Sequence, residues 1–176
     1  MNVFISSSGE LSSRVAKILR YALPTILQSM HVFYSSEDVK IGSFWLEQIS
    51  DNLRNADFMI LCLTKANIRS PWILFEAGAA SGRGNVLILL LIDVSHSDFD
   101  ASPLAQFQST RFVREDLYKL IVFLNDKLES PLSLSILERS FHAMWPSIEM
   151  EYTRAINDST ILPIDKKVNP RSHKED

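Results

Sequence analysis

Trp72 and Glu76 are the residues whose types and spacing could do chemistry, because they place an aromatic ring and a carboxylate four positions apart. Ser70 suits the cap of a helix and Pro71 its first position, so a helix is predicted to begin there. Residues four apart share one helix face, and the small residues at 77–82 let a ligand approach closely. The pair could therefore form the wall and the acid of a catalytic pocket. A solvated glutamate and a core tryptophan would have the same spacing.

The composition is that of an ordinary globular protein. With 176 residues, the chain is long enough for one well-buried domain. The formal net charge is −3 and the pI is about 5.8. A basic surface is what nucleic-acid backbones require, so we expect no nucleic-acid partner.

The single cysteine, Cys62, excludes a disulfide within the chain. It lies in the apolar run 58–63, which favours a small buried side chain over a nucleophile. The longest apolar run, 86–92, is too short to cross a bilayer, and the N-terminus lacks the pattern of a secretory signal. The four histidines have no partners at ligand spacing. We therefore expect a cytoplasmic protein with no membrane contact and no metal site.

Stretches with the periodicity of strands and of helices alternate along the chain. Strands are predicted at residues 2–6, 31–34, 57–64, 86–94 and 110–113. Helices are predicted at residues 10–23, 44–54, 71–82, 116–128 and 134–156. Pro146 is expected to kink the last of these helices or to begin a new one.

This order predicts an α/β fold: a flavodoxin-like open parallel sheet of five strands with helices on both faces. Ligands bind such sheets beyond the carboxyl ends of the strands. The polar loops after the first three strands, including 6–9 and 35–43, are therefore expected to converge on one crevice with Glu76. Residues 1–130 are predicted to form this domain, residues 131–160 a helical extension packed on it, and residues 161–176 a disordered tail.

Several segments carry a family resemblance in their order and spacing. They are the first strand and loop at 3–6, the glycine-to-tryptophan passage at 42–49, the third strand at 57–64, and the Ser-Pro-Trp segment that leads to Glu76. Together they resemble a bacterial Toll/interleukin-1 receptor (TIR) domain of the NAD-cleaving type. One departure is that many members carry an aspartate soon after the first-loop serine, where this chain has Gly9 and Glu10.

The resemblance implies that NAD is a substrate, cleaved between nicotinamide and ribose to give ADP-ribose or a cyclic ADP-ribose, with Glu76 as the catalytic residue. The carboxylate could stabilise the positive sugar carbon, hold the ribose hydroxyls or form a transient covalent bond. Trp72 is expected to shape the same pocket. The other expected substrate-binding residues are Phe4 and Phe33 for stacking, Ser6 and Ser7 for ribose or phosphate, and Lys40 and Arg83 for pyrophosphate. Core packing, loop capping and solvation are the ordinary roles of such residues. No glycine-rich phosphate motif is present, so no retained cofactor is expected.

The loop at 35–44 is, in similar domains, the surface through which protomers pack side by side. Homo-oligomerisation is therefore expected to activate the enzyme. Its nucleotide product would signal to a separate effector in bacterial antiphage immunity, or NAD would simply be depleted. Two alternatives stay open: a non-catalytic adaptor that binds other TIR domains, and a nucleoside deoxyribosyltransferase-like enzyme, which also sets a glutamate against an anomeric carbon. A receiver domain is disfavoured because 5–8 offers no phosphoacceptor aspartate.

Overall fold

The computed structural model of the protein describes residues 1–34, 54–82 and 84–161. The predicted loop at 35–43, nearly all of the predicted helix at 44–54, the tail, Lys40 and Arg83 lie outside the described residues. Within the described ranges, every helix is too short or too polar to traverse a lipid bilayer.

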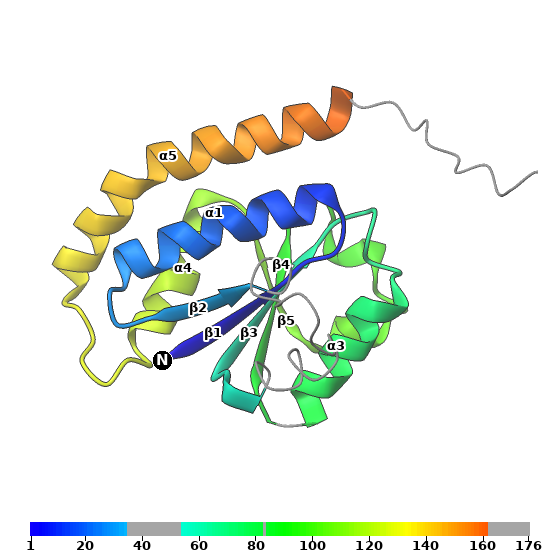
Figure 1. Ribbon diagram of the computed structural model, residues 1–176, viewed down its shortest axis with the longest axis horizontal. Helices are drawn as coiled ribbons and strands as arrows, with labels where there is room; N and C mark the ends of the chain where they lie inside the picture. Colours follow the sequence, from blue (N-terminus) through cyan, green and yellow to red (C-terminus); the bar gives the residue numbers. More distant parts are fainter. Residues whose placement is uncertain (35–53, 83, 162–176) are drawn as a thin grey trace, which may run out of the picture.

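Five parallel strands form one sheet in the order β2-β1-β3-β4-β5 (Figure 1). The strands are β1 (Asn2–Ser6), β2 (His31–Tyr34), β3 (Phe58–Leu63), β4 (Val86–Leu91) and β5 (Gln108–Arg111). The helices are α1 (Glu10–Ile26), α3 (Pro71–Gly82), α4 (Arg114–Asn125) and α5 (Leu134–Ile161), with two short 3-10 turns, η1 (His96–Asp98) and η2 (Pro103–Gln106). The predicted five-stranded parallel α/β fold is confirmed.

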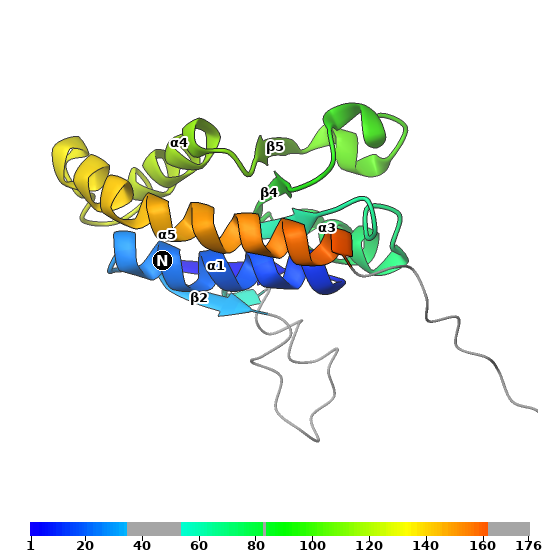
Figure 2. The same cartoon turned by 90° about the horizontal axis from the view of Figure 1, so that it is seen from above.

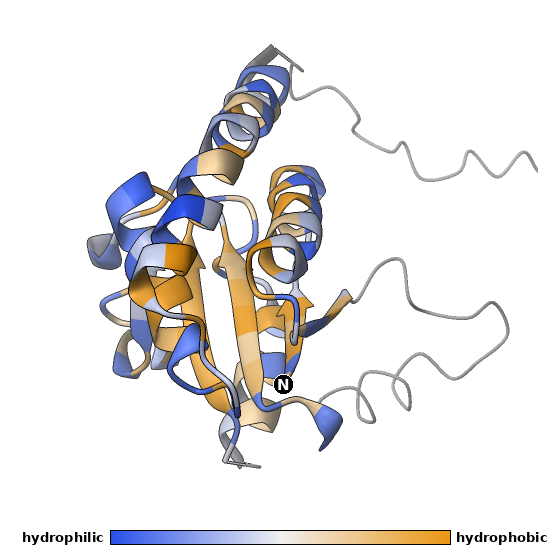
Figure 3. Ribbon diagram, turned by 90° about the vertical axis from the view of Figure 1, so that its left-hand side faces the viewer, coloured by the Kyte–Doolittle hydropathy of each residue, from blue (hydrophilic) through white to orange (hydrophobic). Residues whose placement is uncertain are grey.

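Both faces of the sheet are apolar. Successive side chains of a strand point to opposite faces, so each face has its own set of buried apolar residues. One face packs under α1 and α4, and its buried strand residues are Val3, Ile5, Tyr34, Phe58, Ile60, Cys62, Ile88 and Leu90. The other packs under α3, and its strand residues are Phe4, Met59, Leu61, Leu63, Leu87, Leu89 and Leu91. The central strands are accordingly orange in the hydropathy colouring of Figure 3. This double burial explains the near-continuous apolar runs that mark β3 and β4 in the sequence.

α5 lies along α1, and the two helices run in opposite directions (Figures 1 and 2). Its buried residues recur at helical spacing and join the core on the α1 side: Leu137, Phe141, Trp145 and Ile148. Farther along α5, the ring of Tyr152 stacks on Phe112 with 4.3 Å between ring centroids. The Tyr152 hydroxyl donates a hydrogen bond to the carbonyl of Ile92 at 3.1 Å. α5 therefore covers α1 and also holds the segments that follow β4 and β5.

Replacing Tyr152 with phenylalanine should lower the free energy of unfolding by about 1 kcal/mol, because the ring contact is kept and one hydrogen bond is lost. Urea denaturation at neutral pH measures the change. Tyr21→Phe is the matched control, since Tyr21 is 68% exposed on α1. Equal stability of the two variants would contradict a structural role for the contact with Ile92.

Two predicted helices continue through a proline. α1 extends past Pro24 to Ile26, whereas an end at residue 23 was predicted. A proline removes one backbone donor, but Ile26 and Leu27 are buried in the core and hold the last turn in place. α5 is one helix across Pro146, so that proline begins no new helix. The yellow first part and the orange second part of α5 run in different directions in Figure 1, as expected of a helix that bends at a proline.

The last part of the sheet differs from the predicted boundaries. β4 ends at Leu91, and β5 begins at Gln108, two residues before the predicted start. β5 is a short edge strand with mostly exposed polar side chains, so hydrophobic patterning gives little signal there. α4 begins at Arg114 and ends at Asn125, again earlier than predicted. The segment between β4 and β5, predicted as loop, contains both 3-10 turns.

Candidate active site

Glu76 lies on the side of α3 that faces the sheet. The helix begins at Pro71, as predicted, and its first backbone hydrogen bond runs from the amide of Leu74 to the carbonyl of Ser70 at 3.3 Å. Its buried residues follow helical spacing: Ile73, Glu76, Ala77 and Ala80. Glu76 is thus the polar member of an otherwise apolar stripe, and its exposed fraction is 0%.

Ser6 meets Glu76 from the sheet. It is the last residue of β1, and strand alternation points it to the same face as Phe4, which is the face that α3 covers. The Ser6 hydroxyl donates a hydrogen bond to Oε2 of Glu76. The carboxyl group therefore lies at the carboxyl end of the sheet, where ligands bind in open parallel folds, and the predicted meeting of the first loop with the Glu76 helix is observed.

The environment of Glu76 raises its pKa from 4.5 to about 7. Burial is the main cause, because it disfavours the charged form. Hydrogen bonds from the side chains of Ser6 and Trp72 lower the pKa and offset part of this effect. Oε1 has no hydrogen-bond partner of normal geometry among the described residues. Near neutral pH the group is poised between its acid and carboxylate forms, as is common for residues that act in catalysis.

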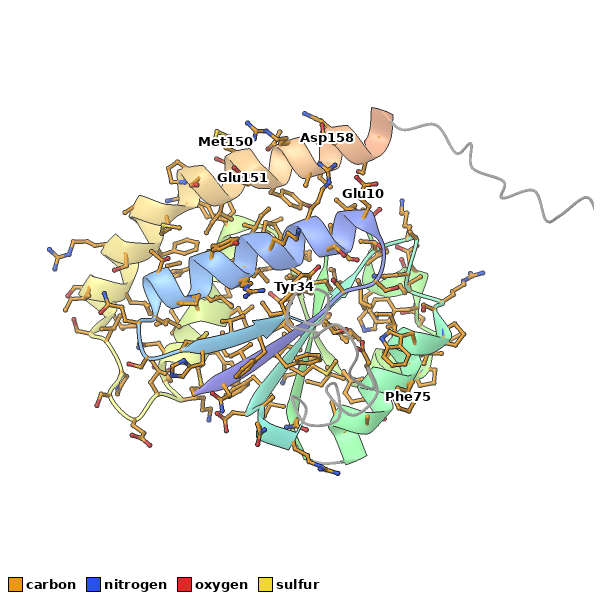
Figure 4. All side chains as sticks on the ribbon, in the orientation of Figure 1. Glu10, Tyr34, Phe75, Met150, Glu151 and Asp158 are labelled. Atoms are coloured by element: carbon orange, nitrogen blue, oxygen red, sulfur yellow. The ribbon has the colours of Figure 1, made fainter. Side chains whose placement is uncertain are left out.

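The aromatic residues predicted to bind substrate occupy different environments. Trp72 is half-buried beside Glu76, and its ring centroid lies 5.3 Å from that of Phe75. Phe75 was not predicted as a site residue; it is 52% exposed on the outer side of α3 (Figure 4). Phe4 is fully buried in the core. Phe33 is its neighbour in the sheet register and is only partly buried. Of the predicted rings, the structure brings Trp72 to the carboxylate.

Ser7 points to the opposite face of the sheet from Ser6. Its hydroxyl lies 3.2 Å from the hydroxyl of Tyr34 and 3.3 Å from that of Ser13. Tyr34 is fully buried at the end of β2 (Figure 4). The two predicted serines are therefore divided: Ser6 contacts Glu76, and Ser7 ties β1 to β2 and α1.

The side chain of Tyr34 contacts Ser7 and that of Asn67 bonds to Ser8, so both hold the loop after β1, and neither residue was singled out from the sequence. A tyrosine that ends an apolar strand carries a weak signal, because its ring can be buried while its hydroxyl bonds to a loop. An asparagine three residues after Thr64 is a recognisable turn signal. Neither pattern reveals which distant loop the side chain contacts.

Glu10 does not take part in the Glu76 site. It is the first residue of α1, its side chain is 57% exposed, and it forms an ion pair with Arg14 at 2.7 Å. Arg14 also pairs with Asp158 of α5. Figure 4 shows Glu10 and Asp158 near each other at that end of α1 and α5. The acidic residue that departs from the family pattern therefore belongs to the contact between α1 and α5.

The described residues offer few other sites for chemistry. No group of three or more histidine, cysteine, aspartate or glutamate side chains converges among them. Burial raises the pKa of the Cys62 thiol to about 12, so the reactive thiolate is not formed at neutral pH. Two hollows that described residues line lie elsewhere: one of about 450 Å³ between α1 and α5, and one of about 700 Å³ between α5 and the start of α4. Glu76 itself is fully covered in this structure.

The comparison with protein families agrees with this architecture. A family model described as TIR domain matches residues 3–122. A comparison with curated proteins finds no match. The matched region begins in β1 and ends within α4, so it contains the sheet, Ser6 and Glu76, while α5 follows it. The match covers more than half of the chain, and the protein belongs to the TIR domain family.

Proposed function

We propose that this protein cleaves the bond between nicotinamide and ribose in NAD+, with Glu76 as the catalytic residue. The observation that carries the proposal is a fully buried glutamate at the carboxyl end of the sheet, bonded to Ser6 and with a pKa near 7. Membership of the TIR domain family supports it, because that family includes NAD-cleaving enzymes. NAD+ is a substrate in this proposal, and no cofactor is retained.

The chemistry requires a fixed negative charge. When the bond from the sugar carbon to nicotinamide breaks, its electron pair leaves with the ring nitrogen and neutralises the pyridinium. The sugar carbon is left with positive oxocarbenium character, which the carboxylate of Glu76 stabilises in a site screened from water. Ser6 holds one carboxylate oxygen in place. Trp72 forms a wall of the same site, and the partly buried Phe33, on the same face of the sheet, is a further proposed substrate contact.

The intermediate can then take one of two paths. Water adds to the sugar carbon and gives ADP-ribose with release of a proton, or a nucleophilic group of the same molecule adds, also with loss of a proton, and gives a cyclic ADP-ribose. We propose that the product acts in bacterial antiphage signalling, through an effector that recognises it. Release of nicotinamide is common to both paths, so it is the appropriate first measurement.

Self-association is part of the proposal. TIR domains commonly associate with one another, and we propose that protomers pack through residues 35–44. In similar domains this segment can complete the active site of the neighbouring protomer, so we expect dilute protein to be a poor enzyme and activity to increase more than in proportion to concentration.

Incubating the protein with NAD+ at increasing protein concentration, and under crowding conditions, tests the proposed activity. Nicotinamide and the nucleotide product are followed by chromatography, and a deoxynucleoside with an acceptor base is supplied in parallel. Nicotinamide release supports the proposal. No release at any concentration would favour a non-catalytic adaptor, and base exchange on the deoxynucleoside alone would favour a deoxyribosyltransferase.

The rate of nicotinamide release should rise with pH through about 7 and then level off, because the ionised form of Glu76 is the active one. Below the pKa, kcat/KM should fall about tenfold per pH unit as the carboxylate becomes protonated. Initial rates across this range measure the effect. A rate that increases toward acidic pH would contradict the assigned role, since it would require the neutral acid.

A further inference from the structure

Asn67 joins the two loops that flank the Ser6–Glu76 pair. It lies in the turn between β3 and α3, and its exposed fraction is 2%. Its Oδ1 accepts a hydrogen bond from the amide of Thr64 at 2.8 Å. Its Nδ2 donates to the carbonyl of Cys62 at 2.9 Å and to the carbonyl of Ser8 at 2.9 Å. The first two contacts close its own turn, and the third crosses to the loop between β1 and α1.

Ser8 is fixed from its other side by α1. The buried hydroxyl of Ser12 accepts from the amide of Ser8 at 3.1 Å and donates to its carbonyl at 2.7 Å. Gly9 then turns the chain into α1 with a φ of 94°, in the region that favours glycine. Both polar backbone atoms of Ser8 are therefore engaged, and Asn67 supplies the contact that comes from the β3 side.

These contacts connect directly to the pair in the site. Ser8 is two residues after Ser6, and the turn that contains Asn67 leads into α3, which carries Glu76. Ser6 and Glu76 meet across a single hydrogen bond, so a small shift of either loop would separate them. We propose that Asn67 is a positioning residue that fixes the loop after β1 against the turn before α3 and thereby holds Ser6 on the carboxyl group of Glu76. The inference deepens the proposed function and rests on it for its catalytic consequence.

The test compares Asn67→Ala with Asn125→Ala. Asn125 is a matched control because it is equally buried, at 1% exposure. Its side chain also bonds two backbone atoms, the amide and the carbonyl of Leu132, each at 2.9 Å, but it lies between α4 and α5. Asn67→Ser is a milder variant. The shorter hydroxyl-bearing side chain can still accept the hydrogen bond from the Thr64 amide, but it cannot reach the Ser8 carbonyl.

The main measurement is the pH titration of the Glu76 carboxyl group, monitored by ¹³C NMR. The Glu76 signal is the one that disappears in the spectrum of Glu76→Gln. The Ser6 hydrogen bond lowers the Glu76 pKa, so Ser6→Ala should move the midpoint upward. Asn67→Ala and Asn67→Ser should move it in the same direction, and combining either with Ser6→Ala should add no further shift. Asn125→Ala should leave the midpoint unchanged. In the NAD assay, the Asn67 variants should lower kcat roughly tenfold, as expected when a reacting group is misplaced.

An unmoved midpoint in the Asn67 variants, with a clear shift in Ser6→Ala, would overturn the inference. An equal shift in Asn125→Ala would also overturn it, because the effect would then reflect general loss of packing. The titration needs no activity, so it separates the two proposals. If every protein fails to cleave NAD+ but the midpoints move as expected, the proposed function fails and the positioning of Glu76 by Asn67 stands.

Discussion

Replacing Glu76 with glutamine should lower the rate of nicotinamide release by at least about 10³-fold, because the neutral amide cannot offset positive charge on the sugar carbon. Glutamine has almost the same shape and can still accept the hydrogen bond from Ser6. The variant should therefore fold and bind NAD+ much as the unchanged protein does. Single-turnover assays with concentrated protein, together with circular dichroism spectra, separate a loss of chemistry from a loss of structure.

Glu10→Gln is the matched control for this substitution. Glu10 is the acidic residue closest to the position where family members often have aspartate, and it pairs with Arg14 on the surface. Its replacement should leave nicotinamide release within about twofold of the unchanged protein, since exposed ion pairs contribute little. Strong loss of activity in Glu10→Gln with none in Glu76→Gln would move the catalytic role to the start of α1.

Most of the fold follows from local patterns that burial enforces. β3 and β4 are apolar on both faces, and their continuous hydrophobic runs identify them as central parallel strands. β5 has polar, largely exposed side chains, so its boundaries depend on pairing with β4 and not on its own pattern. The predicted end of α1 at residue 23 was too early, because packing of Ile26 outweighs the one hydrogen bond that Pro24 removes.

The candidate site also contains some features that the sequence predicts and others that it does not. The shared helix face of Trp72 and Glu76 is predictable, because their spacing and the start at Pro71 are local features of one helix. The burial of Glu76 is not, because a solvated glutamate has the same spacing. The meeting of Ser6 with Glu76 follows from the rule that loops at the carboxyl ends of parallel strands converge. Asn67 is different: its partner Ser8 lies 59 positions away, and nothing in a turn sequence specifies a contact at that distance. Likewise, the sequence distinguishes Ser6 from Ser7 only after the register of β1 is known.

Glu76→Gln should also make the folded protein more stable above neutral pH. The pKa of Glu76 is 4.5 in its ordinary state and about 7 in the folded protein. Between these pH values the folded state binds the proton more tightly than the unfolded state does. The contribution of this group to the free energy of unfolding is therefore fully present below pH 4.5 and is lost as the pH rises through 7. A shift of this size corresponds to about 3 kcal/mol. Glutamine does not titrate, so the variant avoids this loss.

The expected result is a stability difference that changes with pH in one defined window. Relative to the unchanged protein, Glu76→Gln should gain about 3 kcal/mol between about pH 4.5 and about pH 8.5, which is a shift of roughly 6–12 °C in melting temperature for a chain of this size. Comparing the two proteins across this pH window removes any pH-independent effect of the buried amide on stability. Glu138→Gln, which changes an exposed carboxylate on α5, should show no gain in this window. Parallel stability curves for Glu76→Gln and the unchanged protein would mean that the carboxyl is not held in a desolvated site, and the argument for a catalytic carboxylate with a raised pKa would fail with it.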